Sequence, residues 1–305
     1  MMPTLSSTLQ KLEWHAVLPQ ERARYEDFAK IENTRSADYA FANLYLWDET
    51  YHQHIAYTNG RAVIRFANGD GTHRYSFPIG DGPLAPVLEL LTNEAKTEGT
   101  PLMLVGVTEA QKEQALAVCP DFEVRETRDY FDYLYPAEAL ATLSGKKLHG
   151  KRNHVNAFCA AHSFEVRALT PADFPACREI LAQWDAQREG ETVNAEHRAI
   201  LRAFEAFDAL ALSGALLVAD GAAVAFTIGG RITPDTFCVH FEKALPAWQS
   251  AYPVINREFV RMILACDPAI AFINREDDMG LPNLRQAKLS YRPTELVAKY
   301  ALQAP

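Results

Sequence analysis

The sequence predicts an α/β (α+β) protein assembled from two similar modules. Two hairpin signals, Asn59-Gly60 and Asp220-Gly221, each lie between alternating apolar runs. Two further apolar runs, Leu102 to Val107 and Ala269 to Ile273, are typical of buried strands. Segments with helical spacing separate these strands in both halves, and strands that alternate with helices indicate an α/β architecture.

Length and composition limit the class of protein. At 305 residues the chain is long for one core and sufficient for two domains. Its net charge of −9 argues against wholesale binding to nucleic acid or anionic membranes, although a local basic patch can still bind them. Five cysteines without a CxxC pair indicate reduced thiols, no disulfide framework and no metal site. We find no secretory signal and no transmembrane stretch, and therefore expect a soluble cytoplasmic protein.

The first half begins with a helix predicted from Pro19 to Ile31, with Phe28 and Ile31 on its inner face. The aromatic stretch from Tyr39 to Tyr51 fits a core better than a ligand platform. The hairpin at Asn59-Gly60 comes next. The remaining predicted elements are a strand at 73–80, a helix at 84–96, a strand at 102–107, a helix at 109–118 and an aromatic strand at 129–135.

The second half repeats this order of elements. It opens with a strand at 163–169, and Pro171 begins a helix that extends to about Glu189. Asp173 lies in the first turn of that helix, where it complements the helix dipole. The later elements are a helix at 196–212, the hairpin at 220–221, a strand at 236–243, a helix at 253–265, a strand at 269–273, a short helix from 283 and a last strand at 295–302.

The recurrence of one element order, with a period of roughly 160 residues, suggests two copies of one module. Residue identity between the halves is negligible, so this prediction rests on element order. We predict an N-terminal domain at 1–142, a basic connecting helix at 143–162 and a C-terminal domain at 163–305.

A concentrated group of charged and polar residues follows the apolar run that ends at Ile273. The group consists of Asn274, Arg275, Glu276, Asp277 and Asp278. A Gly/Pro turn and a short helix come next, an arrangement in which an open α/β sheet presents a site at its carboxyl edge. Two alternatives remain open. The segment can be a solvated acidic turn, or Arg285 and Lys288 can pair with the carboxylates and only close the fold.

A second candidate group lies on the strand at 236–243. Strict alternation places His240 and Glu242 on one face, with Val239 and Phe241 on the other. His240 can act as a general base, with Glu242 orienting it or taking the proton itself. Lys243 can neutralise a phosphate or carboxylate at the strand end. The alternative is that His240 is an ordinary structural histidine.

The connecting helix carries the third candidate group, a basic patch in an acidic protein. Helical spacing places Lys147, Lys151 and His154 on one side of it. The predicted anion-binding residues are Lys146, Lys147, Lys151, Arg152, Asn153 and His154. A solvated linker helix is the alternative interpretation.

Three segments, GKKLHGKRNHVNAF (145–158), VHFEKA (239–244) and INREDDMGLPNLRQAKLSYRP (273–293), resemble a bacterial family related to the C-terminal synthase domain of phosphatidylglycerol lysyltransferases. The resemblance implies two tandem domains of the GCN5-related N-acetyltransferase (GNAT) fold, each with a mixed central sheet. It also implies transfer of an aminoacyl group from a charged tRNA. Those enzymes carry a transmembrane portion that is not found here, which puts a lipid acceptor in doubt.

In acetyltransferases of this fold, a glycine-rich loop holds the pyrophosphate of coenzyme A at a helix N-terminus. The corresponding segment here, ALPAWQSAYPVIN (244–256), has no glycine and two prolines, which disfavours that cofactor. We therefore expect no cofactor. The resemblance leaves an aminoacyl-tRNA donor, which the basic patch can contact.

Under this interpretation, Glu276, Asp277 and Asp278 bind a cationic group of the aminoacyl donor. Asn256 and Asn274 hold polar atoms of the substrates, and Lys288 and Tyr291 stabilise the oxyanion. The predicted function is aminoacyl transfer from tRNA to an amine or hydroxyl of a small molecule or lipid headgroup. Two alternatives are an acyl-CoA-dependent N-acyltransferase and a non-catalytic protein that binds an amino-acid-like ligand.

Overall fold

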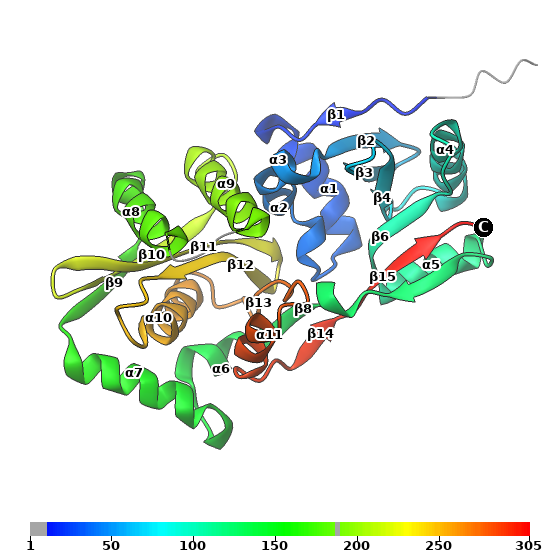
Figure 1. The fold of residues 1–305 in the computed structure, drawn as a ribbon. Helices are drawn as coiled ribbons and strands as arrows, with labels where there is room; N and C mark the ends of the chain where they lie inside the picture. The colour runs from blue at the N-terminus through cyan, green and yellow to red at the C-terminus, as the bar shows by residue number, and fades with distance from the viewer. Residues whose placement is uncertain (1–10, 187–189) are drawn as a thin grey trace, which may run out of the picture.

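The computed structural model of the chain describes residues 11–186 and 190–305, whose strands form two sheets (Figure 1). The first sheet contains β1 (His15–Ala16), β2 (His54–Thr58), β3 (Arg61–Ala67), β4 (His73–Ser76), β5 (Ile79–Gly80), β6 (Met103–Thr108), β7 (Glu123–Glu126) and β15 (Lys299–Gln303). The second contains β8 (Asp132–Pro136), β9 (Phe164–Ala168), β10 (Ser213–Ala219), β11 (Ala222–Thr233), β12 (Thr236–Ala244), β13 (Phe272–Asn274) and β14 (Glu295–Val297).

The α-helices lie between and around these strands. They are α1 (Arg22–Glu32), α2 (Phe41–Leu46), α3 (Asp48–Tyr51), α4 (Leu84–Thr97), α5 (Glu109–Val118), α6 (Ala137–Thr142), α7 (His149–Ala161), α8 (Phe174–Asp185), α9 (Glu191–Glu205), α10 (Ala251–Cys266) and α11 (Pro282–Leu289). In the described parts of the chain, no helix is both long and apolar enough to cross a membrane.

The two sheets have the same order of strand directions. In the first, β1-β2-β3-β4 are antiparallel, β4 and β6 are parallel, and β15 and β7 continue antiparallel. In the second, β9-β10-β11-β12 are antiparallel, β12 and β13 are parallel, and β8 and β14 continue antiparallel. This agreement supports the predicted pair of modules.

The halves exchange one strand each. β8 precedes the predicted linker at 143–162 but pairs with β13 and β14 in the second sheet. β15, at the C-terminus, lies between β6 and β7 in the first sheet. The continuous last strand predicted from Glu295 to Leu302 is therefore wrong, since β14 and β15 belong to different sheets. Each half of the chain therefore contributes one strand to the sheet that the other half mainly forms.

Local signals account for most of the other elements. Both hairpins turn at the predicted dipeptides, where Asn59 and Asp220 have positive φ and each precedes a glycine that also has positive φ. α1 is present, but Ile31 is 52% exposed and does not lie on its inner face as predicted. α8 ends at Asp185, and its predicted end at Glu189 lies outside the described residues.

Helices cover both faces of the second sheet (Figure 1). On one face, α8 and α9 join Phe226 and Phe241 in a core that continues into the first sheet. On the other face, α10 packs with α6 and α7 over a separate core that includes Val239 and Phe259. The first face therefore adjoins the N-terminal half, whereas the second face lies beneath α10.

A β-bulge lies in the middle of β12. Ile228 of β11 pairs with Phe241, but the next residue, Gly229, pairs with Val239, so His240 is left over between these two pairs. A Cβ atom at Gly229 would lie 2.1 Å from the carbonyl oxygen of Cys238, so this close approach requires glycine. The Gly229-Gly230 pair within an apolar strand is the sequence signal that could have predicted the bulge.

A buried ionic network joins the two halves where the strands cross over. The Lys299 ammonium on β15 donates to Asp38 at 2.7 Å and to Asp132 at 2.8 Å. Lys299 and Asp132 are each about 1% exposed. Asp132 also accepts the backbone N–H of Ala37 and the amide of Asn274. Because these residues come from both halves, the network connects the two sheets next to the loop that follows β13.

Candidate functional site

The candidate site lies where β12 and β13 stop pairing. Their parallel ladder extends only from Thr236 with Phe272 to Cys238 with Asn274. β12 then continues to Ala244, while the chain after β13 forms the charged loop at 275–278. Side chains of both segments are thus brought together at one edge, as the sequence predicted for the charged end of this strand.

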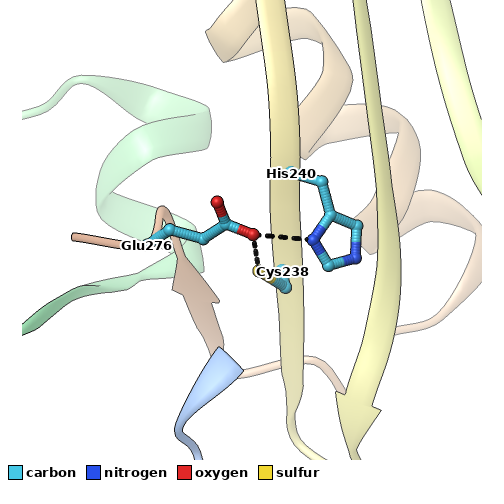
Figure 2. A group of neighbouring side chains, drawn as sticks. All are labelled: Cys238, His240 and Glu276. Carbon is cyan, nitrogen blue, oxygen red and sulfur yellow. Dashed lines mark hydrogen bonds and ion pairs between the residues drawn. The ribbon is translucent and has the colours of Figure 1, made fainter. Parts of the chain in front are cut away.

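His240 and Glu276 form the centre of this arrangement (Figure 2). The His240 Nδ1 atom lies 2.8 Å from Oε1 of Glu276, and the imidazole is almost completely buried. Glu276 has a positive φ of 54°, so the loop backbone turns its side chain back toward β12. The Cys238 thiol lies 3.7 Å from the same carboxylate oxygen.

This contact assigns distinct roles to the two imidazole nitrogens. A carboxylate only accepts hydrogen bonds, so Nδ1 carries the proton. Nε2 lies on the opposite side of the ring from Glu276 (Figure 2), and within the described part of the chain this buried atom has no hydrogen-bond partner. A buried, unpaired imidazole nitrogen is unusual and is suited to accept a proton from a substrate.

The partner of His240 differs from the one predicted. Glu242 does not orient His240, because the bulge moves these two residues onto different faces of the sheet. The predicted pairing of Val239 with Phe241 on one face is wrong for the same reason, since these side chains lie in separate cores. Glu242 instead accepts hydrogen bonds from Asn256 and Arg275, each at 3.1 Å.

Asn274 fixes the start of the charged loop. Its Oδ1 accepts the backbone N–H of Glu276 at 2.6 Å. Its Nδ2 donates to the Arg35 carbonyl at 2.8 Å and to Asp132 at 3.1 Å. Asn274 is fully buried, so it positions Glu276 and ties the loop to the junction between the halves.

The three acidic residues of the loop have three different environments. Asp278 is fully buried and paired with Arg285 and Arg128. Burial raises the pKa of its carboxyl, but hydrogen bonds from Arg285, Tyr133 and the Gly280 backbone outweigh burial and lower it to about 2. Asp278 therefore closes the fold, as the ion-pair alternative predicted. Asp277 is half-buried, and burial together with neighbouring carboxylates raises its pKa to about 7. Glu276 is engaged by His240.

Two other predicted residues contact groups away from His240. The Lys288 ammonium donates to the backbone carbonyls of Arg275 and Asp277, and burial lowers its pKa. It thus stabilises the loop rather than facing Nε2. Lys243 lies on the α9 face, where it pairs with Glu196 at 2.7 Å and contacts the Trp184 ring.

The predicted basic residues divide into three types. Lys146 and Lys147 are exposed in the 3₁₀ turn before α7. Arg152 and Asn153 make local contacts with Leu143 and His149, whereas His154 contacts Ser250, 96 positions away in the sequence. Lys151 is half-buried, and its ammonium lies 4.2 Å from the centre of the Tyr291 ring. Lys151 thus joins Arg275 and Tyr291 on the α10 face, apart from His240.

The side chains of Cys238, His240 and Glu276 also meet a distance criterion for a metal site. Their possible ligand atoms all lie within 4.8 Å of one another. Burial, followed by the charge of Glu276, raises the pKa of the Cys238 thiol well above its ordinary value. The thiol is then neutral, so a metal ion would first have to displace its proton.

Solved structures similar to this chain share its architecture. A conserved protein of unknown function from Bacteroides thetaiotaomicron is 34% identical, with a TM-score of 0.90 over 96% of this chain and 100% of that one. The C-terminal domain of a putative lysylphosphatidylglycerol synthetase from Agrobacterium fabrum is 12% identical, with a TM-score of 0.64 over 94% and 92%. A tandem GNAT protein from the clavulanic acid biosynthesis pathway is 11% identical, with a TM-score of 0.54 over 97% and 99%.

A curated relative, an uncharacterized protein from Mycoplasmoides gallisepticum, is 25% identical over 179 residues, and the match spans 56% of each chain. The shared sheet architecture gives this protein the GNAT-like fold. Among proteins of this fold, the chain belongs to the family described as phosphatidylglycerol lysyltransferase, C-terminal, whose model matches residues 29–303. The predicted family and fold are confirmed.

Proposed function

We propose that this protein transfers an aminoacyl group from a charged tRNA to an amine or hydroxyl acceptor, with His240 as the general base. The observation that carries this proposal is the buried His240–Glu276 hydrogen bond, which leaves Nε2 as an unpaired proton acceptor. Membership of the family supports the class of donor.

The reaction requires two proton transfers, one from the acceptor to His240 and one from His240 to the tRNA oxygen. The acceptor N–H or O–H gives its proton to His240 Nε2 as its nitrogen or oxygen forms a bond to the ester carbonyl carbon. When the tetrahedral intermediate collapses, the bond to the tRNA ribose oxygen breaks and the imidazolium protonates that oxygen. Glu276 stabilises the transient imidazolium through Nδ1.

Asp277 is the acidic residue of the loop that best suits a cationic group of the substrate. Asp278 already pairs with two arginines, and Glu276 supports His240. Burial, followed by the charges of Asp132 and Asp38, raises the pKa of Asp277, and an arriving ammonium would favour the ionised carboxylate.

The acyl-CoA alternative receives no such support from the segment between β12 and α10. There the backbone N–H groups of Trp248 and Ala251 donate to the carbonyls of Leu245 and Trp248. A pyrophosphate held by backbone amides needs such donors free and pointing toward it.

The test is label transfer from a pool of radiolabelled aminoacyl-tRNAs in the presence of cell extract. We expect the wild-type protein to move one label faster than spontaneous ester hydrolysis. The His240→Gln variant should lose about 10²- to 10⁴-fold in rate, the usual contribution of a general base. Equal rates for the variant and the wild-type protein would refute the proposed role of His240. A clear rise in melting temperature with coenzyme A would favour the alternative instead.

A further inference from the structure

Five segments of the chain bring a second group of side chains together on the α10 face of the second sheet: β12, α7, α10, the loop after β13 and the turn after α11. Arg275 donates to Oε1 of Glu242, and Asn256 donates to its Oε2. The Arg275 guanidinium lies 4.9 Å from the centre of the Tyr291 ring, and the Lys151 ammonium lies 4.2 Å from the same centre. Residues that the sequence assigned to three separate roles thus form one cluster, here called the Arg275 cluster.

Positive charge exceeds negative charge in the Arg275 cluster. Both oxygens of Glu242 are engaged, one by Arg275 and one by Asn256. Among residues 11–186 and 190–305, Lys151 has no hydrogen-bond or ion-pair partner, and its ammonium lies over the Tyr291 ring. Burial lowers the pKa of Lys151, and the nearby charge of Arg275 lowers it further. A bound anion beside the Lys151 ammonium and the Arg275 guanidinium would favour the charged form of Lys151.

Two buried polar atoms of the Arg275 cluster lack partners as well. Nη1 of Arg275 has no hydrogen-bond acceptor within the described residues, although arginine donors are seldom left unpaired in an interior. Oδ1 of Asn256, a residue only 1% exposed, likewise has no described donor. The cluster therefore offers two cationic donors for an oxyanion and one acceptor for a neighbouring hydroxyl.

The position of this cluster relates it to His240. Glu242 follows His240 on β12 but faces α10, whereas His240 faces the side of α8 and α9. Arg275 immediately precedes Glu276 in the loop after β13. The charged tRNA can therefore bind on the α10 side of β12. Its aminoacyl end can meet His240 at the point where β12 and β13 no longer pair.

We infer that the Arg275 cluster binds a phosphodiester at the 3′ end of the nucleic-acid donor, an inference that rests on the proposed aminoacyl transfer. Arginine and lysine together are typical of phosphate recognition. The unpaired Asn256 oxygen suits a ribose hydroxyl beside that phosphate. Exposed Lys146 and Lys147 continue the positive charge from Lys151 to the surface, which fits the consecutive phosphates of a single strand better than one lipid headgroup.

The probe is a fluorescein-labelled RNA trinucleotide of sequence CCA, and its binding is followed by fluorescence anisotropy at low salt. We expect Lys151→Gln and Arg275→Gln each to weaken binding on the order of tenfold, the loss typical of one hydrogen bond to a charged group. Lys30→Gln on α1 is the matched control and should bind as the wild type does, because Lys30 is exposed and distant in sequence from the cluster.

Thermal unfolding of the same variants gives an independent measurement. Lys151→Gln should melt at the same temperature as the wild type or higher, because it removes an unpaired, half-buried charge. If Arg275→Gln alone fails to fold, CCA binding is measured on the double variant Arg275→Gln/Glu242→Gln instead. This variant replaces the ion pair by neutral groups of similar shape.

The outcomes separate this inference from the proposed function. Unchanged CCA binding in Lys151→Gln would overturn the phosphate site, even if transfer still depends on His240. Loss of transfer in His240→Gln with CCA binding intact supports both the site and the proposed function. Binding to phosphatidylglycerol vesicles that requires Lys151, without binding to CCA, would overturn the nucleic-acid assignment in favour of a lipid phosphate.

Discussion

Replacing Lys299 by methionine should strongly destabilise the protein, because this lysine neutralises two carboxylates at the crossing of the halves. Its ammonium lies 2.7 Å from Asp38 and 2.8 Å from Asp132. Each pair is worth about 6 kcal/mol of Coulomb energy at an effective dielectric constant of about 20. Desolvation offsets much of that energy, but removing one partner of a buried pair still costs about 3–5 kcal/mol, because the remaining charge is left buried.

Urea denaturation followed by circular dichroism measures this loss as a change in the free energy of unfolding. Lys112→Met is the matched control. Lys112 pairs with Glu109, a half-exposed residue, and the loss there should stay below about 1 kcal/mol. The double variant Lys299→Met/Asp132→Asn should recover part of the stability, since it removes one of the stranded charges. A Lys299→Met protein as stable as the Lys112→Met control would refute the importance of this network.

Three further predictions concern the loop after β13 and the residues of β12 and β13 beside it. Asp277→Asn should raise stability at about pH 8 and leave it nearly unchanged at about pH 4, as measured by melting temperature. The folded-state pKa of about 7 exceeds the unfolded value, so the native state binds an extra proton between them, and stability falls as pH rises through that window. Asn274→Ala should slow transfer more than it weakens substrate binding, since it frees the Glu276 backbone, and a fall in affinity alone would count against this role. Cys238→Ser should keep transfer within about threefold of wild type, and chelators should have no effect, if His240 acts as a base without a metal. Abolition of activity by both treatments would indicate a metal site instead.

The sequence predicted the elements well where a local signal determined them. The turns at Asn59-Gly60 and Asp220-Gly221 lie where their dipeptides require positive φ. The strand that ends in Asn274 also leads into a charged loop, as its apolar run and polar end indicated. These features are determined by residues adjacent in sequence, so a short segment is enough to predict them.

Features that depend on distant contacts were not predictable in this way. Alternation along β12 gave the wrong face for Glu242, because the bulge at His240 arises from the register with Gly229 on another strand. The pairing of His240 with Glu276 joins residues 36 positions apart. The exchange of β8 and β15 brings Lys299 together with Asp38 and Asp132, and none of these residues stood out in sequence.

The proton on the His240 imidazole provides the most direct test of the proposed site. Nitrogen-15 NMR of histidine-labelled protein distinguishes the two neutral tautomers of an imidazole. We predict a protonated Nδ1 and an unprotonated Nε2 for His240, with the signal assigned by its loss in His240→Gln. The opposite tautomer would contradict the account, because Nε2 could then accept no proton and Glu276 would have no N–H to bind.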